Sequence, residues 1–190
     1  MKKLAVVVSD LFDPRWEIPA LLTLAVVAAY RDGATLVFLG LLLFIDAVLP
    51  GWFYWHLHQK KEISDWDITD RHQRMPLYVF TTIAHLGGLG LAYAVGQMVL
   101  FETLLVFWML AVMFTIVTHF WKISVHVGMN AALATYLVVT FGSGWLWMYV
   151  IVVVVGWSRV LLKKHLVAQA LVGGLLGTLG ILAGMRVVGL

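Results

Sequence analysis

Residues 101–120 read FETLLVFWMLAVMFTIVTHF, a run of twenty residues in which Glu102 is the one acidic or basic side chain apart from a histidine. A helix of that length rises about 30 Å, which matches the hydrocarbon core of a bilayer. The run therefore predicts a membrane-spanning helix. Similar apolar runs lie on both sides of it along the chain.

The whole chain has the same composition. Of its 190 residues, 62% are hydrophobic and 12% are charged, and the mean hydropathy is +0.94. Soluble domains average about 50% apolar and about 25% charged residues, so this excess excludes a water-soluble fold. The 9 Trp, 6 Tyr and 10 Phe are typical of aromatic belts at the bilayer surfaces. Because the chain has no cysteine, disulfides, thiol nucleophiles and Cys-based metal sites are excluded.

We expect an all-α, polytopic transmembrane helical bundle of six to seven spans, built as a single integral-membrane domain over residues 1–190. Residues 18–30 are the weakest candidate, because that run is short and charged residues precede it. Residues 1–16 are expected to form an interfacial N-terminal segment, since their apolar run is too short for a signal peptide. The candidate spans are residues 18–30, 34–55, 76–95, 101–120, 125–141, 145–162 and 166–187.

The last candidate span carries four glycines at positions that allow close helix approach. We expect them to serve packing within the bundle rather than dimerisation. They are Gly173, Gly177, Gly180 and Gly184.

Residues 56–74, HLHQKKEISDWDITDRHQR, form the one long polar interruption and are predicted to be a loop at the active-site face. Two spans lead from Arg74 to Lys122, and two more lead from His126 to Arg159. A pair of spans that leaves a face returns to it, so these polar clusters are expected at one membrane face.

Most Lys and Arg residues fall on the face that carries these clusters, whereas Arg31 and Arg186 fall on the other. An excess of Lys and Arg in short loops marks the cytoplasmic side of a membrane protein. We therefore expect a multi-pass integral membrane protein whose polar face is cytoplasmic.

Two histidines lie among these clusters. His165 follows Arg159 by six residues, while Ser124 and His126 begin a candidate span. Imidazole acts as a nucleophile or proton donor near neutral pH, and a guanidinium binds phosphate oxygens in a fixed geometry. A serine at a helix N-terminus adds an anion site. With further cations nearby, the pattern predicts phosphate chemistry; those cations are Lys61, Arg71, Arg74 and Lys122.

The order of these residues resembles the type 2 phosphatidic acid phosphatase (PAP2) superfamily over roughly residues 60–180. The family's third motif is Ser-Arg, five residues, His, three residues, Asp; here it reads Ser158, Arg159 and His165, with Gln169 in the last place. Its second motif, Pro-Ser-Gly-His, corresponds to Ile-Ser-Val-His ending at His126.

The first motif, a Lys followed by Arg-Pro, is the loosest match. Arg74, Met75 and Pro76 stand for Arg-Pro, and Asp67 occupies the position of the Lys. A nearby cation, Lys61 or Arg71, would then supply that charge.

The resemblance implies a PAP2-like bundle that hydrolyses a lipid phosphomonoester or diphosphate through a phosphohistidine, with no metal or other cofactor. It implies that His165 is the nucleophile and that His126 protonates the leaving alcohol. It places Arg74, Arg159 and Ser124 in the phosphate cradle. Gln169 would orient His165 without adding charge, which predicts a rate lower by about one to a few powers of ten.

The expected partners are the bilayer and a membrane lipid phosphate, with no nucleic acid. Phosphatidate, phosphatidylglycerol phosphate and polyprenyl diphosphate all fit a membrane-resident substrate. A non-catalytic lipid-phosphate binder or transporter is an alternative. Gln169 and the altered second motif favour it.

A second alternative rests on the acidic run DWDITD, residues 65–70, which resembles one of the two Mg²⁺-binding loops of UbiA-like membrane prenyltransferases. A second acid-rich loop is missing from the sequence. The competing interpretation is a solvated loop whose three carboxylates, Asp65, Asp67 and Asp70, pair with Arg71 and Arg74.

Asp46 and His85 each lie about ten residues from the polar end of a candidate span, and at about 1.5 Å per residue this places both roughly 15 Å deep. Their helices are expected to be antiparallel neighbours. The sequence therefore predicts that the two side chains form a buried hydrogen-bonded pair.

Overall fold

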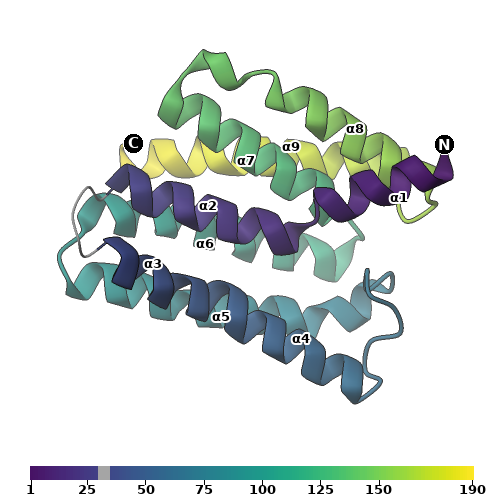
Figure 1. The fold of residues 1–190 in the computed structure, drawn as a ribbon, viewed down its shortest axis with the longest axis horizontal. Helices are drawn as coiled ribbons and strands as arrows, with labels where there is room; N and C mark the ends of the chain where they lie inside the picture. The colour runs from purple at the N-terminus through teal and green to yellow at the C-terminus, as the bar shows by residue number, and fades with distance from the viewer. Residues whose placement is uncertain (30–34) are drawn as a thin grey trace. The chain divides into compact units, whose positions relative to one another are not determined.

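The computed structural model describes residues 1–29 and 35–190, and every regular element in these ranges is a helix (Figure 1). The all-α class is thus confirmed for the described part of the chain. Three positions named by the sequence predictions, Tyr30, Arg31 and Ala34, lie outside the described residues.

Five helices of the described chain are long and apolar enough to cross a membrane, which is compatible with a multi-pass membrane protein. Two further helices are shorter: α2 (Pro14–Ala29) has 16 residues and α7 (Val125–Phe141) has 17. The count of six to seven spans stays a prediction. The five long helices cover Leu36–Gln59, Arg71–Ala94, Met98–Phe120, Ser143–Leu161 and Val167–Val188.

The chain divides into two compact units, which are described one at a time. The first contains residues 1–17 and 122–189, and the second contains residues 18–121 together with Leu190. The expectation of a single integral-membrane domain stays a prediction.

The first unit is built from α1 (Lys2–Leu11), α7, a short 3-10 turn η2 (Ser143–Trp145), α8 (Met148–Leu161) and α9 (Val167–Val188). Helix α7 lies against both α8 and α9, and α1 packs on α8 (Figure 1). Small and β-branched side chains fill the space between these helices, and Val8 and Phe12 of the N-terminal segment pack on them. The buried members are Val127, Ala131, Ala134, Val152, Val155 and Ala170.

Two glycines of α9 let its backbone touch that of α7. A Cβ atom at Gly173 would collide with the carbonyl oxygen of Ser124, and one at Gly177 would collide with the carbonyl oxygen of Gly128. This close approach confirms that these two glycines serve packing within the bundle, because only a residue without a side chain fits there.

Gly177→Ala is therefore expected to force α9 away from α7. Overpacking of this kind costs about 2 kcal/mol, which corresponds to a drop of roughly 5 °C in melting temperature in detergent. Gly90→Ala is the matched control, because a Cβ atom at Gly90 meets nothing within 4 Å. A Gly177→Ala variant that melts at the wild-type temperature would contradict the packing.

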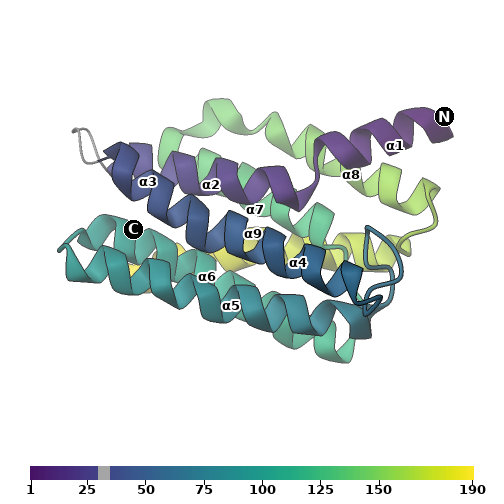
Figure 2. The ribbon, with the colours of Figure 1, turned by 60° about the horizontal axis from the view of Figure 1, so that its bottom comes forward.

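The second unit contains α2 from Ile18 onward, α3 (Thr35–Leu43), a π-helical turn η1 (Phe44–Val48), α4 (Leu49–Gln59), α5 (Arg71–Ala94) and α6 (Met98–Phe120). Helices α5 and α6 run side by side (Figure 2). Arg71 at the start of α5 donates from Nη1 to the carbonyl oxygen of His119 at the end of α6, at 2.9 Å. This hairpin therefore returns the chain to the end at which it began, as expected.

The predicted polar loop, residues 56–74, is shorter than expected. Helix α4 continues to Gln59, and α5 begins at Arg71 rather than at Pro76, which lies inside the helix. The earlier start follows from Asp70, whose side chain accepts the N–H of His72 at 2.9 Å and so caps the helix. Ile63 and Ile68 of the loop are buried against Leu57, so this segment folds back on its own unit.

The predicted pair of Asp46 and His85 is confirmed. The His85 Nδ1 and Asp46 Oδ1 atoms are 2.7 Å apart, and His85 Nε2 lies 3.0 Å from the carbonyl oxygen of Leu104. Since a carbonyl only accepts, His85 Nε2 carries a hydrogen and Nδ1 shares one with Asp46. The pair joins three helices of the second unit, and Asp46 sits in the π-helical turn η1.

Candidate functional site

Three helix ends meet at one end of the first unit and carry most of the predicted site residues. The backbone N–H of Ser124, just before α7, donates to the carbonyl oxygen of Gln169 in the first turn of α9, at 3.0 Å. The N–H of His165 donates to the carbonyl oxygen of Arg159, near the end of α8, at 3.3 Å. The hairpin from α7 to α8 thus brings Ser124, Arg159 and His165 to the same end, as the span count predicts.

Ser124 is the N-cap residue of α7 and is fully buried. Its Oγ atom has no hydrogen-bond partner among the residues that the structure describes. The first N–H groups of a helix lack partners within the helix and carry partial positive charge, so they favour an anion. A buried hydroxyl without a partner beside such N–H groups is an incomplete polar site, of the kind that a bound phosphate oxygen would complete.

Arg159 is 1% exposed, near the end of α8. Its Nη1 atom donates to the Oγ atom of Ser9 in α1 at 2.5 Å. A guanidinium stays charged when buried, because its pKa is far above neutrality, and it therefore needs acceptors or an anion close by. Arg159 thus supplies a fixed positive charge at this end of the unit.

His165 is 5% exposed and lies in the short link between α8 and α9. The adjacent Gln169 accepts the backbone N–H of Leu166 on Oε1 at 3.0 Å and so caps α9. The described contact of the Gln169 side chain is therefore with its own helix. Its predicted role in orienting His165 stays a prediction.

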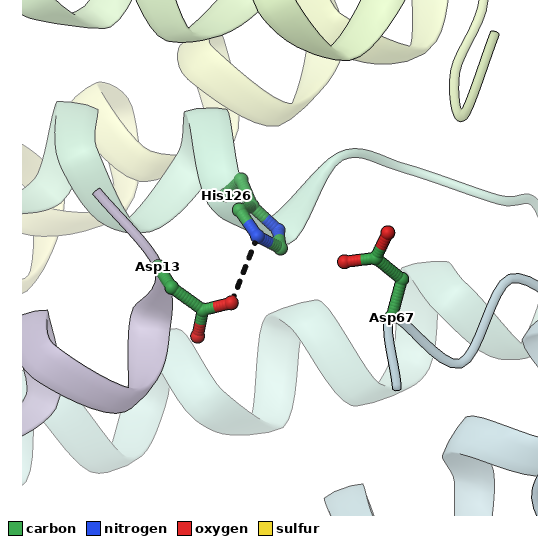
Figure 3. A group of neighbouring side chains, drawn as sticks. All are labelled: Asp13, Asp67 and His126. Atoms are coloured by element: carbon green, nitrogen blue, oxygen red, sulfur yellow. Dashed lines mark ion pairs between the residues drawn. The ribbon is translucent and has the colours of Figure 1, made fainter. Parts of the chain in front are cut away.

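His126, in the first turn of α7, contacts a carboxylate of the N-terminal segment. Its Nε2 atom lies 3.2 Å from Oδ2 of Asp13, and both side chains are largely buried (Figure 3). Asp13 also accepts the backbone N–H of Arg15 at 2.9 Å and a guanidinium N–H of Arg15 at 3.1 Å. Burial alone would raise the pKa of Asp13, but the hydrogen bond and charge of His126, together with the bonds from Arg15, lower this pKa to about 2.

A second carboxyl group lies one helical turn further on. Glu17 is 4% exposed, and burial, with repulsion from the charge of Asp13, raises its pKa to about 9, although the nearby Asn130 side chain acts to lower it. Glu17 is therefore neutral at pH 7. Asn130 is held in place by donating from Nδ2 to the carbonyl oxygens of His126, at 2.8 Å, and Phe12, at 3.2 Å.

Sequence reasoning missed these N-terminal partners. Ser9, Asp13 and Glu17 recur every four residues, a spacing that would place them on one face of a continuous helix, and this was the available signal. In the structure the helix breaks between Leu11 and Pro14. The sequence alone indicated only that charged residues precede a weak candidate span. It carried no sign that Asp13 contacts His126, more than a hundred positions away.

The other predicted phosphate ligands are divided between the units. Lys122 is half-buried and belongs to the first unit, where it is the first residue of the stretch 122–189. Arg74 belongs to the second unit, where it is 4% exposed and donates from Nε to the carbonyl oxygen of Ile68 at 2.6 Å. Arg71 and the exposed Lys61 lie in that unit as well. That these cations join Ser124 and His165 around one anion stays a prediction.

The acidic loop of the second unit uses two carboxylates for its own backbone. Asp65 accepts the backbone N–H groups of Asp67 and Thr69, and Asp70 caps α5. Arg71 donates to the carbonyl oxygen of His119, and Arg74 donates to that of Ile68. The interpretation in which the loop carboxylates pair with these two arginines stays a prediction.

Comparison of the chain with protein-family models, with curated proteins and with solved structures finds no match. The resemblance to the PAP2 superfamily therefore rests on the residues of the three motifs.

Proposed function

We propose that this chain is an integral-membrane phosphatase that removes phosphate from a lipid phosphomonoester or diphosphate through a phosphohistidine, without a metal. The observation that carries the proposal is the buried Ser124 hydroxyl, which has no hydrogen-bond partner among the described residues and stands at the N-terminus of α7. The buried Arg159 and the two histidines at the same end of the unit support it.

In the proposed reaction, a nitrogen of His165 attacks the phosphorus atom while the bond from phosphorus to the lipid oxygen breaks. His126 gives its proton to that oxygen, and the lipid alcohol leaves. Water then attacks the phosphohistidine and returns a proton to His126, which releases inorganic phosphate. Ser124 and Arg159 bind the phosphate oxygens, and Arg74, Lys61, Arg71 and Lys122 are the further cations proposed for this role.

The proposed substrate is a membrane lipid, because an all-helical, apolar protein of this kind meets its substrate within the bilayer. Phosphatidate, phosphatidylglycerol phosphate and polyprenyl diphosphate share the required phosphate group. We place the active-site face in the cytoplasm on the distribution of Lys and Arg. Maleimide labelling in intact cells of single cysteines introduced at Gln59 and Ser143 tests this, and reaction at position 59 alone would reverse the assignment.

Phosphate release from these three lipids, with and without EDTA, tests the proposal. The wild type is expected to act on at least one of them at an undiminished rate in EDTA. Ser124→Ala is expected to lower kcat/KM about 10-fold or more, because it removes one hydrogen bond to a charged oxygen. The exposed Ser143→Ala is the matched control and is expected to behave as wild type. No release from any lipid, or release that requires a divalent metal, would overturn the proposal.

A non-catalytic lipid-phosphate binder is the second candidate. The observation in its favour is the Oε1 atom of Gln169, which caps α9 through Leu166. A binder would retain phosphorylated lipid without releasing phosphate, and the same lipid panel separates the two functions.

A further inference from the structure

Two side chains of the N-terminal segment reach residues that the proposed function places in the site. Ser9 accepts a hydrogen bond from Arg159, and Asp13 lies 3.2 Å from His126 (Figure 3). The two contacts join positions 150 and 113 residues apart in the chain. Ser9 lies in α1, which packs on α8, and Asp13 lies in the break between α1 and α2.

A carboxylate in contact with one imidazole nitrogen has two effects on the ring. It favours a hydrogen on that nitrogen, here Nε2, so that the proton passed to a substrate comes from Nδ1. It also favours the positively charged form of the ring, since opposite charges attract more strongly when both groups are withdrawn from water. Both effects suit a proton donor.

The surroundings of Asp13 keep its carboxylate ionised and fix its position. The side chain accepts two hydrogen bonds from Arg15, and the neighbouring Glu17 is the buried acid that remains neutral. Two carboxyl groups one turn apart are thereby driven to opposite protonation states, an arrangement common where acid and base roles must be separated.

We propose that Asp13 is a positioning residue that holds His126 as the proton donor to the leaving oxygen. This inference rests on the proposed function and extends the site to the N-terminal segment. In the step concerned, the phosphorus–oxygen bond to the lipid breaks, its electron pair stays on the lipid oxygen, and Nδ1 of His126 supplies the proton. The ring is left neutral and keeps its hydrogen on Nε2, beside Asp13.

Asp13 also precedes α2, and its carbonyl and side-chain oxygens accept N–H groups of the first turn. A test must therefore separate positioning of His126 from helix capping. Asp13→Asn does this, because asparagine caps a helix as well as aspartate does but has no charge. Asp10→Asn is the matched control: Asp10 is exposed on α1 and loses the same charge.

The experiment compares two leaving groups in wild type, Asp13→Asn, Asp13→Glu and Asp10→Asn. On an active lipid phosphomonoester, whose alkoxide must be protonated, Asp13→Asn is expected to lower kcat about 10²-fold or more with KM changed by less than about threefold. On p-nitrophenyl phosphate, whose phenolate leaves without a proton, the loss is expected to be less than about fivefold. Asp13→Glu is expected to be more active than Asp13→Asn, because it keeps the carboxylate. Asp10→Asn is expected to have wild-type kcat on both substrates.

Equal losses on both substrates would overturn the inference, because a merely structural role slows both alike. Wild-type kcat in Asp13→Asn would overturn it too. A second measurement does not depend on activity: ¹⁵N-histidine NMR in detergent should show Nε2 of His126 protonated in the wild type and altered in Asp13→Asn. An unchanged spectrum refutes the contact itself, whereas a wild type that releases no phosphate overturns the proposed function and the catalytic role together.

Discussion

His165→Ala is expected to abolish transfer of phosphate to the protein. With a ³²P-labelled lipid phosphate, the wild type should carry acid-labile, base-stable label, as a phosphohistidine does, and the variant should carry none. The rate of phosphate release should fall about 10³-fold or more, because no other imidazole can take the nucleophile's place in the link between α8 and α9.

The control for this substitution is His72→Ala. His72 is exposed in the first turn of α5, and its described hydrogen bond is made by its backbone N–H, which the substitution keeps. Label and rate should both match wild type. Full phosphatase activity in His165→Ala would refute the proposed mechanism, and label that persists in that variant would place the phosphoryl group on another residue.

Glu17→Gln is expected to remove a large pH dependence from the stability of the protein. The folded chain raises the pKa of Glu17 from 4.5 to about 9, so between these values the folded state keeps a proton that the unfolded state releases. Stability therefore falls as pH rises through this window. At pH 8 the loss is about 4 kcal/mol relative to pH 4.5, or roughly 8 to 17 °C in melting temperature.

Glutamine resembles the neutral carboxylic acid in shape and stays neutral at every pH, so the variant avoids this loss. The measurement is the difference in melting temperature between Glu17→Gln and wild type in detergent from pH 5 to pH 9. The difference should grow with pH in favour of the variant. Glu62→Gln is the control, since Glu62 is exposed. A constant difference across the range would show that Glu17 is ionised in the folded protein.

Asp13 has the opposite linkage. Because the folded state lowers its pKa from 3.8 to about 2, its contribution to stability is present above about pH 4 and is lost as pH falls toward 2. The two carboxyl groups therefore affect stability in separate pH windows, and the Glu17 measurement is free of interference from Asp13.

Several features of the fold could be predicted because they depend on counting along the chain. The pairing of Asp46 with His85 followed from equal depth on neighbouring helices, and the bond from Arg71 to the carbonyl oxygen of His119 agrees with a hairpin of two spans. Depth and hairpin direction are set by the rise of about 1.5 Å per residue and by the thickness of the bilayer. The start of α5 was placed five residues too late, because capping by Asp70 depends on the local path of the chain.

The site was only partly predictable. The motif spacing identified Ser124, Arg159 and His165 as neighbours at one end of a unit, since each follows or precedes an apolar run. The motif spacing did not predict the contacts of their side chains. Gln169 was expected to orient His165; its described bond caps α9, and its role at His165 stays a prediction.

By itself the sequence determined that this is a helical membrane protein, where its apolar helices run, and which ends of them carry imidazole, hydroxyl and guanidinium groups. These properties follow from hydrophobicity and helical rise, both of which act locally. Only the tertiary structure decided that Asp13 meets His126, that Ser9 meets Arg159, and that Gly177 brings α9 onto α7. Contacts between residues so far apart in the chain depend on how whole helices pack, and no local pattern encodes that packing.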